Sequence, residues 1–155
     1  MTLALAGCAT DTRFQKLPDH PGGTQPWLQP QIETGQSLVQ EGTHPFAHTS
    51  ALWGLDMECG AYLTDSETIV VYNIVNRAVS SVQLNEIGIT VTDPQGQSLP
   101  HSPKSKWSQP AVLGAGLGVM GSEVFVGVPT NYPVIVTWRL ANGKEMKYPF
   151  DGPAK

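Results

Sequence analysis

The apolar residues of this chain either alternate with polar ones or gather in short β-branched runs. No segment sustains the 3.6-residue period of an amphipathic helix. Thr68–Asn76 is rich in β-branched residues and apolar on both faces, which is typical of a strand covered on both sides. Glu86–Thr92 alternates, and Glu123–Val128 and Pro133–Leu140 are two more strand-like runs. The pattern therefore predicts an all-β fold.

Composition narrows the class further. The chain has 155 residues, which suits one domain, and it contains 16 glycines, 13 prolines and only 14 % charged residues. These values argue against a helical bundle, a coiled coil and a charge-rich disordered chain. The net charge of −4 excludes a broadly basic nucleic-acid binder, so we expect no nucleic-acid partner.

The segment Ala141–Gly143 can join two strands in either of two ways. A two-residue Asn-Gly turn would mix apolar and charged side chains on both faces of the hairpin. A three-residue loop with Gly143 in the left-handed conformation shifts the register by one residue and separates the two kinds of side chain. We expect this second register, which pairs Val136 with Tyr148, Trp138 with Met146, Arg139 with Glu145 and Thr137 with Lys147.

A second hairpin is predicted at Asp93–Gln97. Pro94 presets φ for the turn and Gly96 supplies a positive φ, so Asp93 should pair with Gln97 and Val91 with Leu99. Two hairpins of this kind favour an antiparallel β-sandwich. A seven-strand immunoglobulin-like arrangement fits best, although the Cys–Trp–Cys spacing of true immunoglobulins is absent.

The start of the chain carries a short apolar motif, Leu5-Ala6-Gly7-Cys8. It resembles the lipobox of bacterial lipoproteins. The resemblance implies cleavage before Cys8, attachment of diacylglycerol to its sulfur and acylation of its new amine, which together anchor a protein stably. Ala9, rather than Asp, follows the cysteine, which in that family implies sorting to the outer membrane. The alternative is an ordinary buried N-terminal cysteine.

This motif suggests how the chain is organised. Residues 1–7 are interpreted as a signal remnant, because they lack the basic residues and the length of a complete signal. Residues 8–26 contain four glycine or proline breaks between positions 18 and 23 and predict a disordered, lipidated tether. Residues 27–155 form the sandwich. Within them, Pro30–Val39 is expected to hold one or two short edge strands and Glu41–Ser50 a loop.

The number of cysteines limits which disulfides the chain can form. If Cys8 is acylated, Cys59 is the only thiol left, so it is either buried or paired with another chain. Burial is the expectation, because Cys59 lies in the apolar run Trp53–Leu63.

Two motifs suggest ligands. Gly116–Gly121 matches G-x-G-x-x-G but leads into a strand rather than a helix, so we interpret it as a glycine-rich loop between two sheets and expect no cofactor. His44 and His48 would align two imidazoles for zinc or copper only if they lie on a helix. The alternative is two solvated loop histidines.

No pair of residues stands out as acid and base. Ser98 lacks the second glycine of a nucleophile elbow, so the chain is not expected to be an enzyme.

The long segment Pro100–Gly121 carries His101, Lys104, Lys106 and Trp107. A basic-aromatic cluster on a loop suits a partner interface, although Trp107 can equally fold into the core. The segment is longer than most structureless connections, which favours a functional loop or an extra strand near Ala111–Leu113.

These features together predict an outer-membrane lipoprotein whose sandwich faces the periplasm and binds a protein. It looks like an immunity protein against a secreted toxin, or an accessory subunit of an envelope machine, in its anchor, size and strand pattern. The alternative is an envelope lipoprotein that binds a metal or a small ligand.

Overall fold

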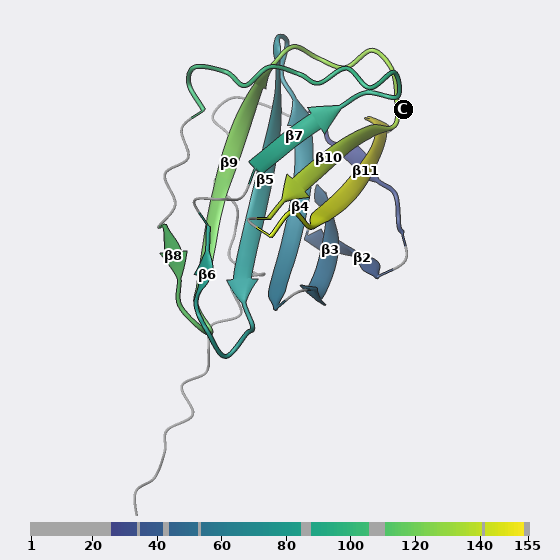
Figure 1. Cartoon of the computed structure of the whole chain (residues 1–155). Helices are drawn as coiled ribbons and strands as arrows, with labels where there is room; N and C mark the ends of the chain where they lie inside the picture. The colour runs from purple at the N-terminus through teal and green to yellow at the C-terminus, as the bar shows by residue number, and fades with distance from the viewer. Residues whose placement is uncertain are drawn as a thin grey trace, which may run out of the picture.

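The computed structural model describes residues 26–33, 35–41, 44–52, 54–84, 88–105, 111–140 and 142–153. Cys8, Lys106 and Trp107 lie outside these residues. The described chain forms a β-sandwich of two antiparallel sheets with a small ribbon beside them (Figure 1). The predicted all-β sandwich is confirmed.

The larger sheet has the order β2-β3-β4-β5-β9 and the smaller one β1-β11-β10-β7. The strands of the larger sheet are β2 (Gln36–Glu41), β3 (His44–Leu52), β4 (Leu55–Leu63), β5 (Glu67–Asn76) and β9 (Gly118–Val126). Those of the smaller sheet are β1 (Leu28–Pro30), β7 (Gly88–Thr92), β10 (Val134–Arg139) and β11 (Glu145–Pro153). The ribbon pairs β6 (Val82–Gln83) with β8 (Val112–Leu113).

The connections between the sheets follow the immunoglobulin pattern. β4, β5 and β9 are neighbours in one sheet, and β7, β10 and β11 are neighbours in the other. From β5 onward the chain changes sheets three times, between β5 and β7, between β7 and β9, and between β9 and β10, as strands B, C, E and F of an immunoglobulin domain do. β1 adds to the smaller sheet and β2 and β3 extend the larger one, so seven strands was too low an estimate.

The core lies between the two sheets. Alternate residues of β4, such as Met57 and Cys59, point into it and are fully buried. The rings of Tyr72 from β5 and Trp138 from β10 meet edge to face, with centroids 5.0 Å apart. Both sides of β5 are buried, as predicted from its sequence.

Both predicted hairpins form in the expected registers. Val136 pairs with Tyr148 and Trp138 with Met146, and Gly143 has a φ of +80°. In the other hairpin, the Asp93 amide donates to the Gln97 carbonyl at 2.9 Å. Leu99 donates to Val91 at the same distance, and Gly96 has a φ of +81°. The strand expected near Ala111–Leu113 is β8.

Two local expectations were wrong. Residues 44–50, expected in a loop, belong to β3, because Ala47 packs into the core while Phe46 packs on the opposite face against Tyr62. The glycine-rich motif is a turn only at its start, where Gly116 has a φ of +75°. From Gly118 onward it is strand β9, because it pairs along β5 and not between the sheets.

Candidate functional site

Two of the four expected partner-binding residues, His101 and Lys104, fall on a segment that borders both sheets, Gln97–Ser105, here called the bridging segment. Lys106 and Trp107 lie outside the described residues. Its first half lies along β7: Leu99 donates to the Val91 carbonyl, and His101 Nε2 lies 3.0 Å from the Ile89 carbonyl. Its second half lies along β9: Ser102 donates to the Val124 carbonyl at 2.8 Å. The bridging segment therefore closes one side of the sandwich.

A buried carboxylate holds the bridging segment in place. Glu123 on β9 is 5 % exposed and accepts a hydrogen bond from the Ser105 hydroxyl. His101 Nδ1 lies 3.5 Å from the same carboxylate, and the His101 ring packs on Phe125 with centroids 4.5 Å apart. Because a carbonyl only accepts, His101 keeps a hydrogen on Nε2.

Lys104 lies at the exposed turn of the bridging segment. Its Nζ is 3.2 Å from Glu67 Oε1, and its side chain is 76 % exposed. An ion pair this exposed adds little stability. The structure thus places His101 and Lys104 on one backbone-anchored segment, and it leaves the lysine ammonium facing solvent.

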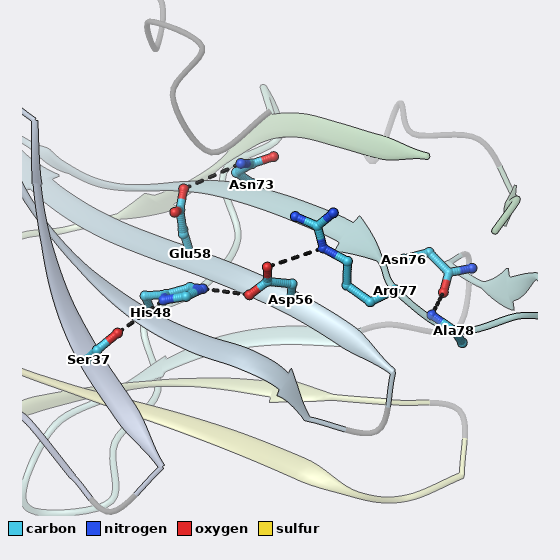
Figure 2. Close-up of polar contacts among 8 residues, drawn as sticks. All are labelled: Ser37, His48, Asp56, Glu58, Asn73, Asn76, Arg77 and Ala78. Atoms are coloured by element: carbon cyan, nitrogen blue, oxygen red, sulfur yellow. Dashed lines mark hydrogen bonds and ion pairs between the residues drawn. The ribbon is translucent and has the colours of Figure 1, made fainter. Parts of the chain in front are cut away.

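A polar network that sequence reasoning missed lies on the outer face of the larger sheet (Figure 2). Ser37 on β2 contacts His48 on β3, with Oγ and Nδ1 3.0 Å apart. His48 Nε2 lies 2.5 Å from Oδ1 of Asp56 on β4, and the other Asp56 oxygen faces the Arg77 Nε at 3.4 Å. His48 and Asp56 are each 5 % exposed.

The order of these contacts sets the direction of the hydrogen bonds. A carboxylate only accepts, so His48 donates its Nε2 hydrogen to Asp56. The other ring nitrogen, Nδ1, shares a hydrogen bond with the Ser37 hydroxyl. Arg77 supplies a positive charge at the other Asp56 oxygen. The network connects three strands and the residue after β5, and it fixes the edge strand β2 against its neighbour.

One sequence signal could have revealed this face. In β4, the polar residues Asp56 and Glu58 alternate with Met57 and Cys59, so they must face away from the core. Asn73 lies opposite Glu58 on β5 and donates to its Oε2 at 3.3 Å. Buried carboxylates require such donors. The partner strand β3 had been interpreted as a loop, so His48 had no predicted register.

The two histidines expected at a metal site lie on one strand, β3, and not on a helix. Four residues of strand separate His44 from His48 by roughly 13 Å, too far for one metal ion. His48 instead contacts Ser37 and Asp56. The described part of the chain holds no group of three or more His, Cys, Asp or Glu side chains arranged to bind a metal.

Cys59 is fully buried and has no disulfide, as expected. Burial raises the pKa of its thiol from 9.0 to about 12. A thiol with this pKa carries no thiolate at neutral pH and is chemically inert.

Comparison with known proteins yields structural neighbours only. No protein-family model and no curated protein matches the sequence. A conserved hypothetical protein from Bacillus anthracis is similar, with 10 % identity, a TM-score of 0.46, and coverage of 75 % of this chain and 99 % of that one. The yjhA protein from Bacillus subtilis is similar too, with 15 % identity, a TM-score of 0.45, and coverage of 72 % and 93 %.

As for a membrane span, no helix among the described residues has the length and apolar character to cross a bilayer.

Proposed function

We propose that this chain is a lipoprotein of the bacterial outer membrane, anchored through Cys8, whose sandwich faces the periplasm and binds a protein partner. Its role would be that of an immunity protein against a secreted toxin or of an accessory subunit in an envelope complex. The lipobox resemblance of Leu5–Cys8 supports the anchor.

One observation carries the binding proposal: the bridging segment is rigidly attached to both sheets yet presents an exposed cation. Seven of its positions from Gln97 to Ser105 make the contacts that hold it to β7, β9 or their turns. Lys104 projects from this frame, and Lys106 and Trp107 follow directly in the sequence. A fixed loop loses little conformational entropy on binding, and Trp is over-represented among interface hot spots. A partner with an acidic surface and an apolar pocket fits these residues.

The binding test compares three variants in envelope extracts of the native host. Trp107→Ala and Lys104→Glu should each lose a partner that the unaltered protein captures and that mass spectrometry identifies. Lys144→Glu, in the loop between β10 and β11, changes charge equally and should retain it. A Trp107→Ala variant with a lower melting temperature would place Trp107 in the core, and equal capture by all variants would refute this interface.

The anchor has a separate test. Mass spectrometry of protein from the native host should find acyl chains on Cys8, and Cys8→Ser should release the protein from the membrane fraction. An unmodified Cys8 sulfur would refute the anchor without affecting the binding proposal.

A further inference from the structure

The four edge strands of the two large sheets differ in how they are protected from pairing with another chain. β7 is covered by the first half of the bridging segment, and β9 is covered along Val124–Val126 by its second half. β1 has only three residues, ends in Pro30 and contains a register shift. Covering segments, short strands and bulges are the usual protections against edge-to-edge pairing. β2 has none of them: within the described residues, no segment pairs with its outer side.

The register of β2 shows which backbone groups face outward. Gln40 pairs with Pro45, which has no amide hydrogen, so this pair cannot be of the hydrogen-bonded kind. Because the two kinds alternate, Ser37 and Val39 bond to β3, whereas Gln36, Leu38 and Gln40 direct their amide and carbonyl groups away from the sheet. The Gln36 amide accordingly donates to the Glu33 carbonyl in the preceding turn.

The outward positions of β2 are symmetric about one residue. Gln36 and Gln40 flank Leu38 at equal distances, and no residue from Gln36 to Gln40 is charged. Leu38 is 47 % exposed, although it is a large apolar residue on a strand. An antiparallel copy of the strand placed on a two-fold axis would therefore set leucine against leucine and glutamine against glutamine. The charged residue of β2, Glu41, lies at its end, beyond this symmetric stretch.

We propose that β2 is a homodimer interface, in which the β2 strands of two copies pair antiparallel about Leu38 and join two five-stranded sheets into one of ten strands. Leu38 of each copy exchanges two backbone hydrogen bonds with Leu38 of the other. The Gln40 amide of each copy donates to the Gln36 carbonyl of the other. The Gln36 amide takes no part in this pairing, because it already donates to the Glu33 carbonyl. This pairing is independent of Cys8 and of the bridging segment.

Two contacts prepare the strand for this role. The Ser37 hydroxyl holds β2 to His48, and the Gln36 side-chain amide donates to the Lys147 carbonyl of the opposite sheet. The edge is thus fixed from both faces before a second copy arrives. A pair of six-residue strands buries less than the ~1,200 Å² of a standard stable complex. We therefore expect a reversible dimer with a dissociation constant of about 1–100 µM.

The first test uses the full chain with Cys8→Ser, examined by analytical ultracentrifugation from about 1 to 200 µM. The parent should shift from monomer to dimer across that range. Leu38→Pro removes an outward amide that bonds to nothing within the sheet, so it should stay monomeric with an unchanged urea midpoint. Leu38→Thr keeps the amide and should still dimerise.

A second test fixes the register and does not depend on how proline is tolerated. In hydrogen-bonded antiparallel pairs the Cα atoms are about 5.5 Å apart, which permits a disulfide. Leu38→Cys should therefore give a disulfide-linked dimer on a non-reducing gel. Ser37→Cys should not, because the two copies of residue 37 would lie about 8 Å apart.

Two outcomes would overturn the proposal. A protein that is monomeric at every concentration, with Leu38→Cys no more cross-linked than Ser37→Cys, contains no such interface. A monomeric protein that loses a different partner through Leu38→Pro uses β2 for that partner's strand instead. Neither result bears on capture through Lys104 and Trp107, which is measured separately.

Discussion

Asp56 is a single side chain that joins two of the polar contacts on the outer face of the larger sheet. Its two oxygens face His48 and Arg77, and it is nearly inaccessible to water. Removing a carboxylate from such a place leaves its former donors without that acceptor in a site of low dielectric constant. The two contacts differ, however. His48 is buried and 2.5 Å away, whereas the Arg77 side chain is 35 % exposed and 3.4 Å away.

We therefore expect Asp56→Ala to lower the free energy of unfolding by about 3 kcal/mol, because the buried His48 loses its acceptor. Arg77→Ala should cost less than about 1 kcal/mol, since its pairing is partly solvated. Urea unfolding of both variants measures the difference. Equal losses for the two would show that Arg77, and not His48, is the main partner of Asp56.

Gly143 illustrates a second effect at single residues, namely backbone conformation without any contact. It has a φ of +80°, and an added Cβ would meet nothing within 4 Å. Gly143→Ala should therefore destabilise the protein by about 1 kcal/mol through left-handed strain alone. Gly143→Asn should cost less, because asparagine tolerates this conformation. Thermal unfolding of the pair checks the order, and a larger loss for the asparagine variant would contradict the explanation.

At the scale of elements, the packing of β4 on its outer side depends on a missing side chain. A Cβ on Gly60 would lie 2.6 Å from ring atoms of Phe46 and 3.0 Å from Trp27. These rings pack edge to face with centroids 5.6 Å apart. Only glycine lets both aromatic rings rest directly on the backbone of β4.

Gly60→Ala should consequently destabilise the protein by roughly 1–3 kcal/mol, because the rings must move aside. It should also change the fluorescence of Trp27. Gly88→Ala on β7 is the control, since an added Cβ there meets nothing within 4 Å. An unchanged melting temperature for Gly60→Ala would mean that the rings shift without cost.

The elements also show what sequence can and cannot predict here. The hairpin around Gly143 was predictable to the residue, because turn chemistry and side-chain alternation agree over a few neighbours. β3 was not, since its two histidines and Pro45 conceal the alternation, and its pairing with β4 depends on contacts far along the chain. Because the register of β3 could not be predicted, the His48–Asp56 contact could not be predicted either. The segment Pro100–Gly121 could be singled out by its length and composition, but the attachment of Pro100–Ser105 to both sheets required the fold.

Among the described residues of the whole molecule, burial raises the pKa of four weak acids. The pKa of Cys59 rises to about 12 and that of Tyr62 from 10.0 to about 12, chiefly by desolvation, and desolvation also raises the pKa of Tyr132 and of Tyr148. In the unfolded chain these groups ionise near pH 9 to 10. Above that range the unfolded state releases protons that the folded state keeps.

The stability that these groups contribute should therefore be fully present at neutral pH and be lost as the pH rises from about 9 toward 12. Urea midpoints of the Cys8→Ser chain from pH 7 to 11 measure this. Adding Cys59→Ala should reduce the slope between pH 9 and 11, because one of the four groups no longer titrates. A midpoint that rises with alkaline pH would contradict the assignment of buried neutral acids.

The junction at Trp27 determines how the domain would respond to being pulled. The first described pairings are the Trp27 bridge to Tyr62 and the hydrogen bond from the Leu63 amide to the Pro26 carbonyl. β1 follows on the other sheet, beside the C-terminal strand β11. If the protein is anchored at Cys8 as proposed, mechanical tension would reach these few bonds before the central strands. Trp27 and β1 would then detach first, and the extension they release would relieve the force while the remaining strands stay paired.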